Sequence, residues 1–221
     1  MNSSDTKARR YFGGEAADDF DAIYDNEGGL LTKFINRFFR RGMRERVELT
    51  LHECERRGGR ALDIGCGSGR VSIMIAKRGV KVVGVDYSQR MIELAKGYLE
   101  EESEHLGRDI DVNFITADFM GDYDPGLSFD VTIALGVFDY VSDPVPFLSK
   151  MRRFTKGAMI AAFPDKHAFQ MPLRKLWLWK RGCPVFFYSS DDVKRLYREA
   201  GIADVEITKV SAGFYVRSEV E

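Results

Sequence analysis

The sequence has few cysteines, and those it has do not form a recognisable pattern. There are three cysteines, an odd number, at Cys54, Cys66 and Cys183. They are widely spaced, and no two of them form a CxxC pair. This spacing excludes a disulfide framework and a cysteine-based zinc site. We therefore expect a protein of the reducing cytoplasm that binds no metal.

The sequence also lacks a charge excess and long apolar runs. Its 33 lysines and arginines balance 34 aspartates and glutamates, whereas general nucleic-acid-binding proteins usually carry a strong basic excess. The longest apolar runs, such as residues 158–163, are far shorter than the ~20 residues that span a bilayer. The polar first residues lack the apolar region of a signal peptide. We expect a soluble, cytoplasmic protein with no nucleic-acid partner.

The length and the apolar content are those of one folded domain. A chain of 221 residues buries roughly 70% of its unfolded surface when it folds. Because 44% of the residues are hydrophobic, extensive disorder is excluded.

From about residue 60, short apolar segments alternate with longer amphipathic ones. Strands are predicted at residues 60–64, 81–85, 112–117, 129–135 and 158–163, and a terminal hairpin at 205–210 and 214–218. Helices are predicted at 70–78, after an N-cap at Ser88, after an N-cap at Asp143 with Pro144 at the first helical position, and after the capping sequence 189–192. This alternation predicts an α/β fold with a mainly parallel sheet covered on both faces.

Two segments fall outside the alternation. Residues 1–55 are helix-like and precede the first strand, and residues 165–188 interrupt the later part with aromatic and basic residues. We therefore divide the single domain into an N-terminal helical cap (1–55), a core (56–164), an insertion (165–188) and a C-terminal helix with its hairpin (189–221).

A glycine loop, Gly65-Cys66-Gly67-Ser68-Gly69, follows the first predicted strand and opens a helix. Such a turn brings backbone N–H groups close to a ligand. The dinucleotide fingerprint needs a further glycine where this chain has Arg70. Asp63, just before the loop, would repel a pyrophosphate but suits a cationic amine. An NAD-dependent oxidoreductase is therefore the less favoured alternative.

Acids end the first three predicted strands. Besides Asp63, Asp86 lies 21 residues after Gly65, where a carboxylate accepts hydrogen bonds from both hydroxyls of a ribose. Asp118 follows the third strand, positioned to accept from an adenine amine while Phe119 flanks the ring. All three acids lie at the carboxyl edge, where open α/β sheets bind ligands. The alternative is that each acid is a helix cap or a turn residue.

The segments DIGCGSGR, VVGVDYS and ADF resemble successive motifs of the class I S-adenosylmethionine-dependent methyltransferases, and the likeness extends from residue 60 to 218. Residues 9–25 are similar to the N-terminal cap of small-molecule members. The resemblance implies a Rossmann-like three-layer αβα sandwich with a seven-stranded sheet whose last strand is antiparallel. It also implies S-adenosylmethionine as the methyl donor and S-adenosylhomocysteine as the product.

The resemblance further implies a cofactor site. Asp63 and the glycines surround the methionine portion, Asp86 holds the ribose, and Asp118 contacts the adenine edge. Tyr24 closes over the cofactor from the cap. The residues implied are Tyr24, Asp63, Gly65, Cys66, Gly67, Asp86, Tyr87, Met91, Asp118, Phe119, Leu135 and Gly136.

The segment after the fourth predicted strand bears on the methyl acceptor. It lacks the Asn/Asp-Pro-Pro-aromatic turn of enzymes that methylate base amines, and Cys183-Pro184 reverses the Pro-Cys order of cytosine C5 enzymes. The segment VFDYVSDPVPFL instead resembles the branch of magnesium-protoporphyrin O-methyltransferases and quinone methyltransferases. We expect a small-molecule acceptor, methylated at oxygen. A non-catalytic S-adenosylmethionine-binding module on the same fold stays open as an alternative.

Methyl transfer from a sulfonium is an in-line displacement, so positioning supplies much of the catalysis. A hydroxyl or carboxyl acceptor needs a general base, or only a carboxylate that is already ionised. The candidates for catalysis are Asp139, Tyr140 and His167. Their alternative roles are a helix cap for Asp139, core packing for Tyr140 and an exposed loop for His167.

Within the insertion, residues 171–188 hold both tryptophans, Trp177 and Trp179, interleaved with lysines and arginines. This mixture fits a lid over an aromatic or apolar substrate with an anionic group. It fits equally a peripheral membrane contact for a lipid-like substrate, or a small satellite core with basic stems.

Overall fold

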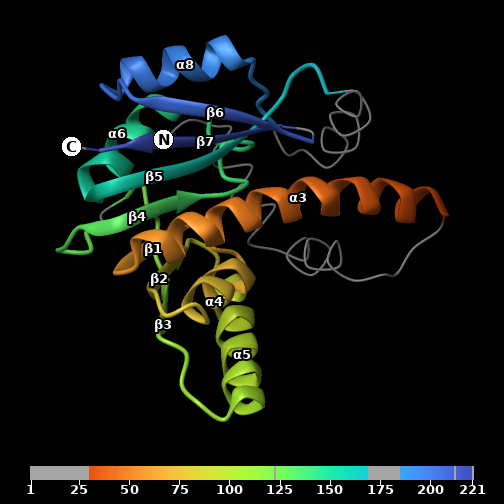
Figure 1. The fold of residues 1–221 in the computed structure, drawn as a ribbon, viewed down its shortest axis with the longest axis vertical. Helices are drawn as coiled ribbons and strands as arrows, with labels where there is room; N and C mark the ends of the chain where they lie inside the picture. The colour runs from red at the N-terminus through yellow and green to blue at the C-terminus, as the bar shows by residue number, and fades with distance from the viewer. Residues whose placement is uncertain (1–29, 122, 169–184, 212, 221) are drawn as a thin grey trace.

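A computed structural model describes residues 30–121, 123–168, 185–211 and 213–220, with side chains from Met43 onward (Figure 1). Within these residues no helix is both long and apolar enough to cross a membrane.

The centre of the fold is a seven-stranded sheet in the order β3-β2-β1-β4-β5-β7-β6. All neighbouring strands are parallel except β7, which is antiparallel to both β5 and β6. The predicted parallel sheet with an antiparallel terminal hairpin is thus confirmed. The strands are β1 (Arg60–Ile64), β2 (Lys81–Asp86), β3 (Val112–Thr116), β4 (Phe129–Ala134), β5 (Thr155–Pro164), β6 (Val205–Val210) and β7 (Gly213–Glu219).

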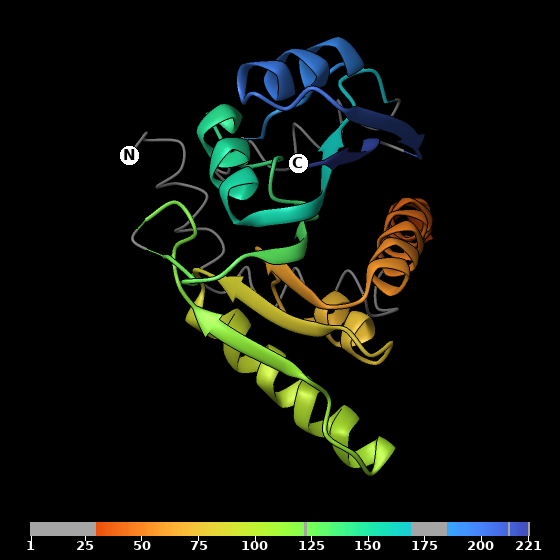
Figure 2. The ribbon, with the colours of Figure 1, turned by 60° about the vertical axis from the view of Figure 1, so that its left-hand side comes forward.

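Helices cover both faces of the sheet and complete the predicted three layers (Figure 2). One face packs against α3 (Leu30–Arg57), α4 (Arg70–Ala76) and α5 (Gln89–Leu106). The other packs against α6 (Pro144–Phe154) and α8 (Ser190–Glu199). Four of the five residues of β1 are buried, as expected of a strand covered on both sides.

Local capping explains where two helices begin, and it corrects one expectation. Ser88 accepts a hydrogen bond from the Met91 N–H, and Ser189 forms a capping box with Asp192, both as predicted. Asp143 precedes α6 but its side chain makes no capping bond. The prolines fit this difference: Pro144 starts the helix with its fixed φ, and Pro146 at the third helical position lacks the N–H from which an N-cap side chain commonly accepts.

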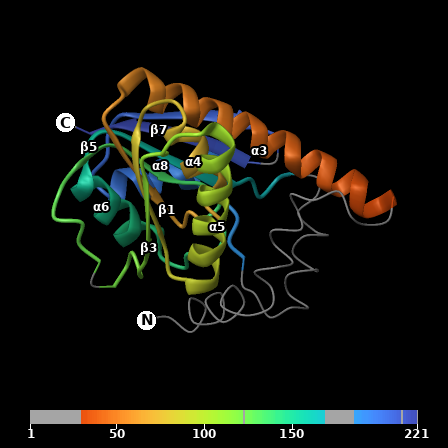
Figure 3. The ribbon, with the colours of Figure 1, turned by 90° about the horizontal axis from the view of Figure 1, so that it is seen from below.

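The helix α3 continues past the predicted end of the N-terminal cap at residue 55. Its C-terminal half packs against β4, β6 and α4, so it is part of the core layer. Its N-terminal end extends beyond the sheet (Figures 1 and 3).

The topology determines where a ligand site can form. The chain crosses from β1 to β2 on the α4 face, whereas it crosses from β4 to β5 on the α6 face. The loops after β1 and β4 therefore diverge at neighbouring strands, which is the switch point where open α/β sheets bind ligands.

Candidate functional site

The glycine loop after β1 is anchored to the end of β2. The N–H groups of Gly65 and Cys66 both donate to the Val85 carbonyl, at 2.7 and 3.2 Å. Gly65 has φ 70°, and a Cβ there would lie 2.6 Å from Val137 Cγ2, in the segment after β4. Glycine is needed here because the loops after β1 and β4 approach each other at the switch point.

The third glycine of the loop was not among the predicted site residues, and it has a packing role. A Cβ on Gly69 would lie 2.4 Å from Phe114 Cζ and 2.8 Å from Ala95 Cβ. This close contact lets α4 start directly against β3 and α5. Around a Cβ on Gly67, in contrast, no described residue lies within 4 Å, so none of the described elements packs against the loop on that side.

Asp86 ends β2 and joins two loops. It is 8% exposed; Oδ2 accepts from the Gly67 N–H at 3.0 Å, and Oδ1 accepts from the Ser88 N–H at 2.9 Å. Burial raises the pKa of Asp86, while the backbone hydrogen bonds oppose that rise. Its carboxylate thus lies beside the glycine loop as predicted, and it also has the turn role of the alternative.

Asp63 is the penultimate residue of β1 and is 3% exposed. Its Oδ2 accepts a hydrogen bond of 2.6 Å from the Ser72 hydroxyl. Burial raises the pKa of Asp63 to about 6; the Ser72 bond opposes the rise and Asp86 adds to it. Burial, with Asp63 and Asp86, also raises the pKa of the Cys66 thiol. No lysine or arginine in the described part forms a salt bridge with Asp63 or Asp86.

Asp118 follows β3 and forms a tight turn. Its Oδ1 accepts from the Met120 N–H at 3.1 Å and its carbonyl accepts from the Gly121 N–H at 3.0 Å. Lys150 of α6 donates to the Gly121 carbonyl at 2.9 Å, which ties the turn to α6. The structure therefore brings all three predicted acids to the carboxyl edge of the sheet.

Phe119 lies in the core. Its ring packs against Phe147 of α6 at 4.9 Å between centroids, and Lys150 Nζ is 5.3 Å from the ring centroid. This packing accounts for a phenylalanine here without a ligand, and the adenine contact stays a prediction.

The remaining predicted cofactor residues surround the same edge. Tyr87 is half-buried directly after Asp86, and Met91 is buried in the first turn of α5. Leu135 and Gly136 are half-buried directly after β4, with Gly136 at φ 79°. Tyr24 lies outside the described residues.

The three catalytic candidates differ in exposure. Asp139 is buried and Tyr140 is half-buried, both in the loop that follows β4. The Asp139 carbonyl accepts from the Phe186 N–H at 2.8 Å. His167 is exposed in the loop after β5, as its alternative role predicted, and its N–H donates to Asp165 Oδ1 at 2.9 Å.

The described end of the insertion packs into the core, and the lid interpretation stays a prediction. Residues 169–184 lie outside the described part, but Tyr188 is a buried residue of the core. Its hydroxyl donates to the Phe138 carbonyl at 3.1 Å, and its N–H donates to the Pro164 carbonyl at 2.9 Å. Burial, and then Asp139, raise the pKa of Tyr188. Tyr188 thus attaches the end of the insertion to β5.

Sequence reasoning also missed a further acid at a strand end, Asp165. It is almost fully buried after β5, and its Oδ2 forms a salt bridge of 3.1 Å with Lys209 of β6. The signal that could have found it is its position directly after an apolar strand. Its cation partner distinguishes it from Asp63 and Asp86.

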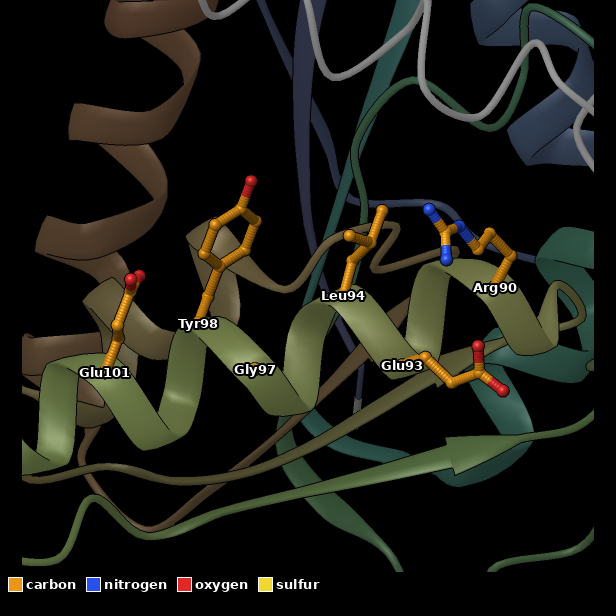
Figure 4. Close-up of a pocket in the computed structure, with 6 residues that line it drawn as sticks. All are labelled: Arg90, Glu93, Leu94, Gly97, Tyr98 and Glu101. Atoms are coloured by element: carbon orange, nitrogen blue, oxygen red, sulfur yellow. The ribbon is translucent and has the colours of Figure 1, made fainter.

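A separate hollow lies along one side of α5 (Figure 4). Its described lining residues include none of the predicted site residues. At one end the Arg70 guanidinium lies 4.3 Å from the centroid of the Tyr98 ring and donates to its hydroxyl at 3.0 Å. The hollow is lined by Arg90, Glu93, Leu94, Gly97, Tyr98 and Glu101.

Comparisons with known proteins give consistent matches. Residues 55–201 match the family model of the methyltransferase domain. The chain is 32% identical over 170 residues to a magnesium-protoporphyrin O-methyltransferase of Rhodobacter capsulatus, covering 74% of this chain and 71% of that protein. It is 31% identical over 164 residues to a ubiquinone biosynthesis O-methyltransferase of Cereibacter sphaeroides, and the match spans 67% of this chain and only 62% of that protein.

Among solved structures, the fold is similar to that of magnesium protoporphyrin IX methyltransferase from Synechocystis PCC 6803 with bound SAH. The TM-score is 0.76 at 22% identity, covering 99% of this chain and 100% of the other. At this identity the likeness concerns the fold alone.

Proposed function

The chain belongs to the methyltransferase domain family, and we propose that it transfers a methyl group from S-adenosylmethionine to an oxygen atom of a small molecule. The observation that carries the proposal is the pair of buried carboxylates, Asp63 and Asp86, beside the glycine loop. Neither has a cationic partner in the described part of the chain. A cationic donor that also bears ribose hydroxyls supplies both of the missing partners.

The residues present fit this donor. Asp86 would accept from the ribose hydroxyls, and Asp63 with the glycine loop would hold the methionine portion. Gly67 is compatible with a ligand beside the loop, because no residue of the described part lies within 4 Å of its Cβ position. When bound, the donor supplies an electrophilic methyl group on a sulfonium. The further proposed contacts are Tyr24, Gly65, Cys66, Tyr87, Met91, Asp118, Phe119, Leu135 and Gly136.

The chain's own residues would act mainly by positioning. The loops after β1 and β4 meet at Gly65 and Val137, so an acceptor held by the β4 loop lies next to the donor. Asp139 and Tyr140 belong to this loop and are the proposed proton acceptors for a hydroxyl substrate, with His167 as the alternative. A carboxylate substrate would need no base because it is already ionised.

The relatives suggest which acceptor to test first. The Rhodobacter capsulatus protein is named for magnesium-protoporphyrin and the Cereibacter sphaeroides protein for ubiquinone biosynthesis. We propose an aromatic or apolar acceptor with an anionic group, and a carboxyl group on a porphyrin-like macrocycle as the first choice. The insertion at residues 165–188 would cover this acceptor, with peripheral membrane contact through residues 171–188 as its alternative role.

The test uses the full chain with isotope-labelled S-adenosylmethionine. Magnesium protoporphyrin and a prenylated catechol are supplied in separate reactions, and products are identified by mass spectrometry. We expect a labelled methyl ester or methyl ether in one of them, and none with Asp86→Asn. Tight binding of S-adenosylhomocysteine without transfer to either acceptor or to a metabolite extract would indicate the non-catalytic module. Failure to bind the donor or its product would contradict the proposal as a whole.

A further inference from the structure

Ser72 is a buried residue in the first turn of α4, behind the glycine loop. Its hydroxyl donates to Asp63 Oδ2 at 2.6 Å, and no part of its side chain is exposed. The bond joins α4 to the end of β1 across the turn that the loop makes. Ser72 is too deeply buried to contact the acceptor, so any role in the reaction acts through Asp63.

The surroundings of Asp63 make this one hydrogen bond important. Within the described part of the chain, the titratable groups near it are Asp86 from β2, Cys66 from the glycine loop and Cys54 from α3. None of these is a cation, and burial raises the pKa of Cys54 to about 12, so its thiol is neutral at ordinary pH. An ionised carboxylate is costly in such surroundings unless a donor stabilises it. The Ser72 hydroxyl is the hydrogen-bond donor that the described structure provides.

We propose that Ser72 is a positioning residue for the methyl donor: its hydroxyl stabilises the ionised form of Asp63 and fixes its orientation, with the second oxygen directed to the donor's amine. This inference rests on the proposed function. The described hydrogen bond occupies Oδ2 alone. Oδ1 is then the oxygen that accepts from the ammonium group of the methionine portion.

The arrangement makes binding of the donor dependent on pH. Because burial raises the pKa of Asp63 to about 6, the free protein holds a proton on this carboxyl below that pH. The proton must leave to the solvent before Asp63 can pair with the ammonium group. Loss of the Ser72 bond raises the pKa of Asp63 further, since that bond favours the ionised form.

The test is calorimetry of S-adenosylhomocysteine binding between pH 5.5 and 9, in two buffers of different ionisation enthalpy. For the wild-type chain we expect the affinity to rise as the pH increases through about 6. Below that pH, binding should release the proton from Asp63 to the solvent. For Ser72→Ala we expect the rise to move up by about one pH unit, which gives a loss of about threefold at pH 6.5, about eightfold at pH 5.5 and near recovery at pH 9. Ser72→Thr keeps the hydroxyl and restores the wild-type profile.

A matched control is available on the opposite face of the sheet. Thr132 and Thr155 share a buried hydroxyl hydrogen bond of 2.7 Å, and Thr155 also donates to the Met151 carbonyl of α6. Thr132→Val removes a bond of the same kind and leaves the pH profile of binding unchanged. A thermal melt of each variant checks that it is folded.

Two results would overturn the inference, and they have different meanings. If Ser72→Ala weakens binding by the same factor at every pH and leaves proton release unchanged, Ser72 has only a structural role. If the wild-type chain does not bind S-adenosylhomocysteine at all, the proposed function fails together with the inference. Measuring the wild-type chain first separates the two cases.

Discussion

Two buried carboxylates, Glu53 and Asp63, lie in opposite electrostatic surroundings. Burial by itself would raise the pKa of Glu53, but hydrogen bonds from Arg56 and Arg57 and the charge of Arg217 lower it to about 2. Glu53 contacts Arg57 Nε at 2.6 Å and Arg217 Nε at 3.1 Å. Burial raises the pKa of Asp63 to about 6, and the hydrogen-bond donor that it has among the described residues is a neutral hydroxyl.

The difference separates a structural acid from a ligand-binding acid. The arginines around Glu53 come from α3 and β7, so this acid joins the first described helix to the terminal hairpin. Asp165 belongs to the same class, because Lys209 of β6 neutralises it. Asp63 and Asp86 lack such a partner in the described part, although they are equally buried. Unpaired buried acids at a strand end indicate that the cation comes from a ligand.

The largest expected effect is on the structural acid. Glu53→Gln leaves its arginines facing a neutral amide, and we expect the free energy of unfolding to fall by ~3 kcal/mol. Urea denaturation measures this loss, while binding of S-adenosylhomocysteine by the folded chain stays unchanged. The control is Glu55→Gln, which breaks an exposed pair with Arg78 and should cost below ~1 kcal/mol. Equal losses in the two variants would contradict the distinction.

The second effect concerns binding. Asp86→Asn removes the charged acceptor proposed for the ribose hydroxyls, and we expect affinity for S-adenosylhomocysteine to fall by about 100-fold. Asp165→Asn is the matched control: an acid at a strand end that already has a cation, Lys209. It should lower stability and leave affinity within about twofold. If both variants weaken binding, an acid matters because it lies at a strand end, and not because it lacks a cationic partner within the described chain.

The third effect is a gain in stability. The pKa of Asp63 rises from 3.8 to about 6 on folding, so its contribution to stability is complete below about pH 4 and is lost as the pH rises through 6. Asp63→Asn removes this loss, and we expect the free chain to be about 1–2 kcal/mol more stable at pH 7.5. Urea denaturation midpoints at pH 5 and pH 7.5 test the direction of this effect. The difference between the two midpoints should be smaller for Asp63→Asn than for the wild-type chain. A variant that is less stable at pH 7.5 would refute the argument.

The sequence predicted the features that depend on nearby residues. The glycine loop, the strand-end acids and the Ser189 cap are encoded within a few positions, and the structure places each as expected. The pairing of Glu53 with Arg217 joins residues far apart in the chain, and no local pattern signals it. The same holds for the bond of Tyr188 to Phe138, since burial of an aromatic insertion depends on tertiary contacts.

The turn that Asp118 forms gives the smallest expected effect. Lys150 of α6 holds this turn through the Gly121 carbonyl, at 2.9 Å. Because this bond is exposed, Lys150→Met should cost below ~1 kcal/mol of stability. Affinity for S-adenosylhomocysteine should fall about two- to threefold, since the turn then holds the adenine contact less firmly.

The control for this last prediction is Arg153→Met, which breaks a pair of 3.4 Å with Asp124, further along the same loop. It should leave affinity unchanged, because its contact lies outside the Asp118 turn. If both variants weaken binding equally, the loop as a whole positions the ligand. If Lys150→Met lowers the affinity for S-adenosylhomocysteine as much as Asp86→Asn does, Lys150 instead contacts the ligand directly.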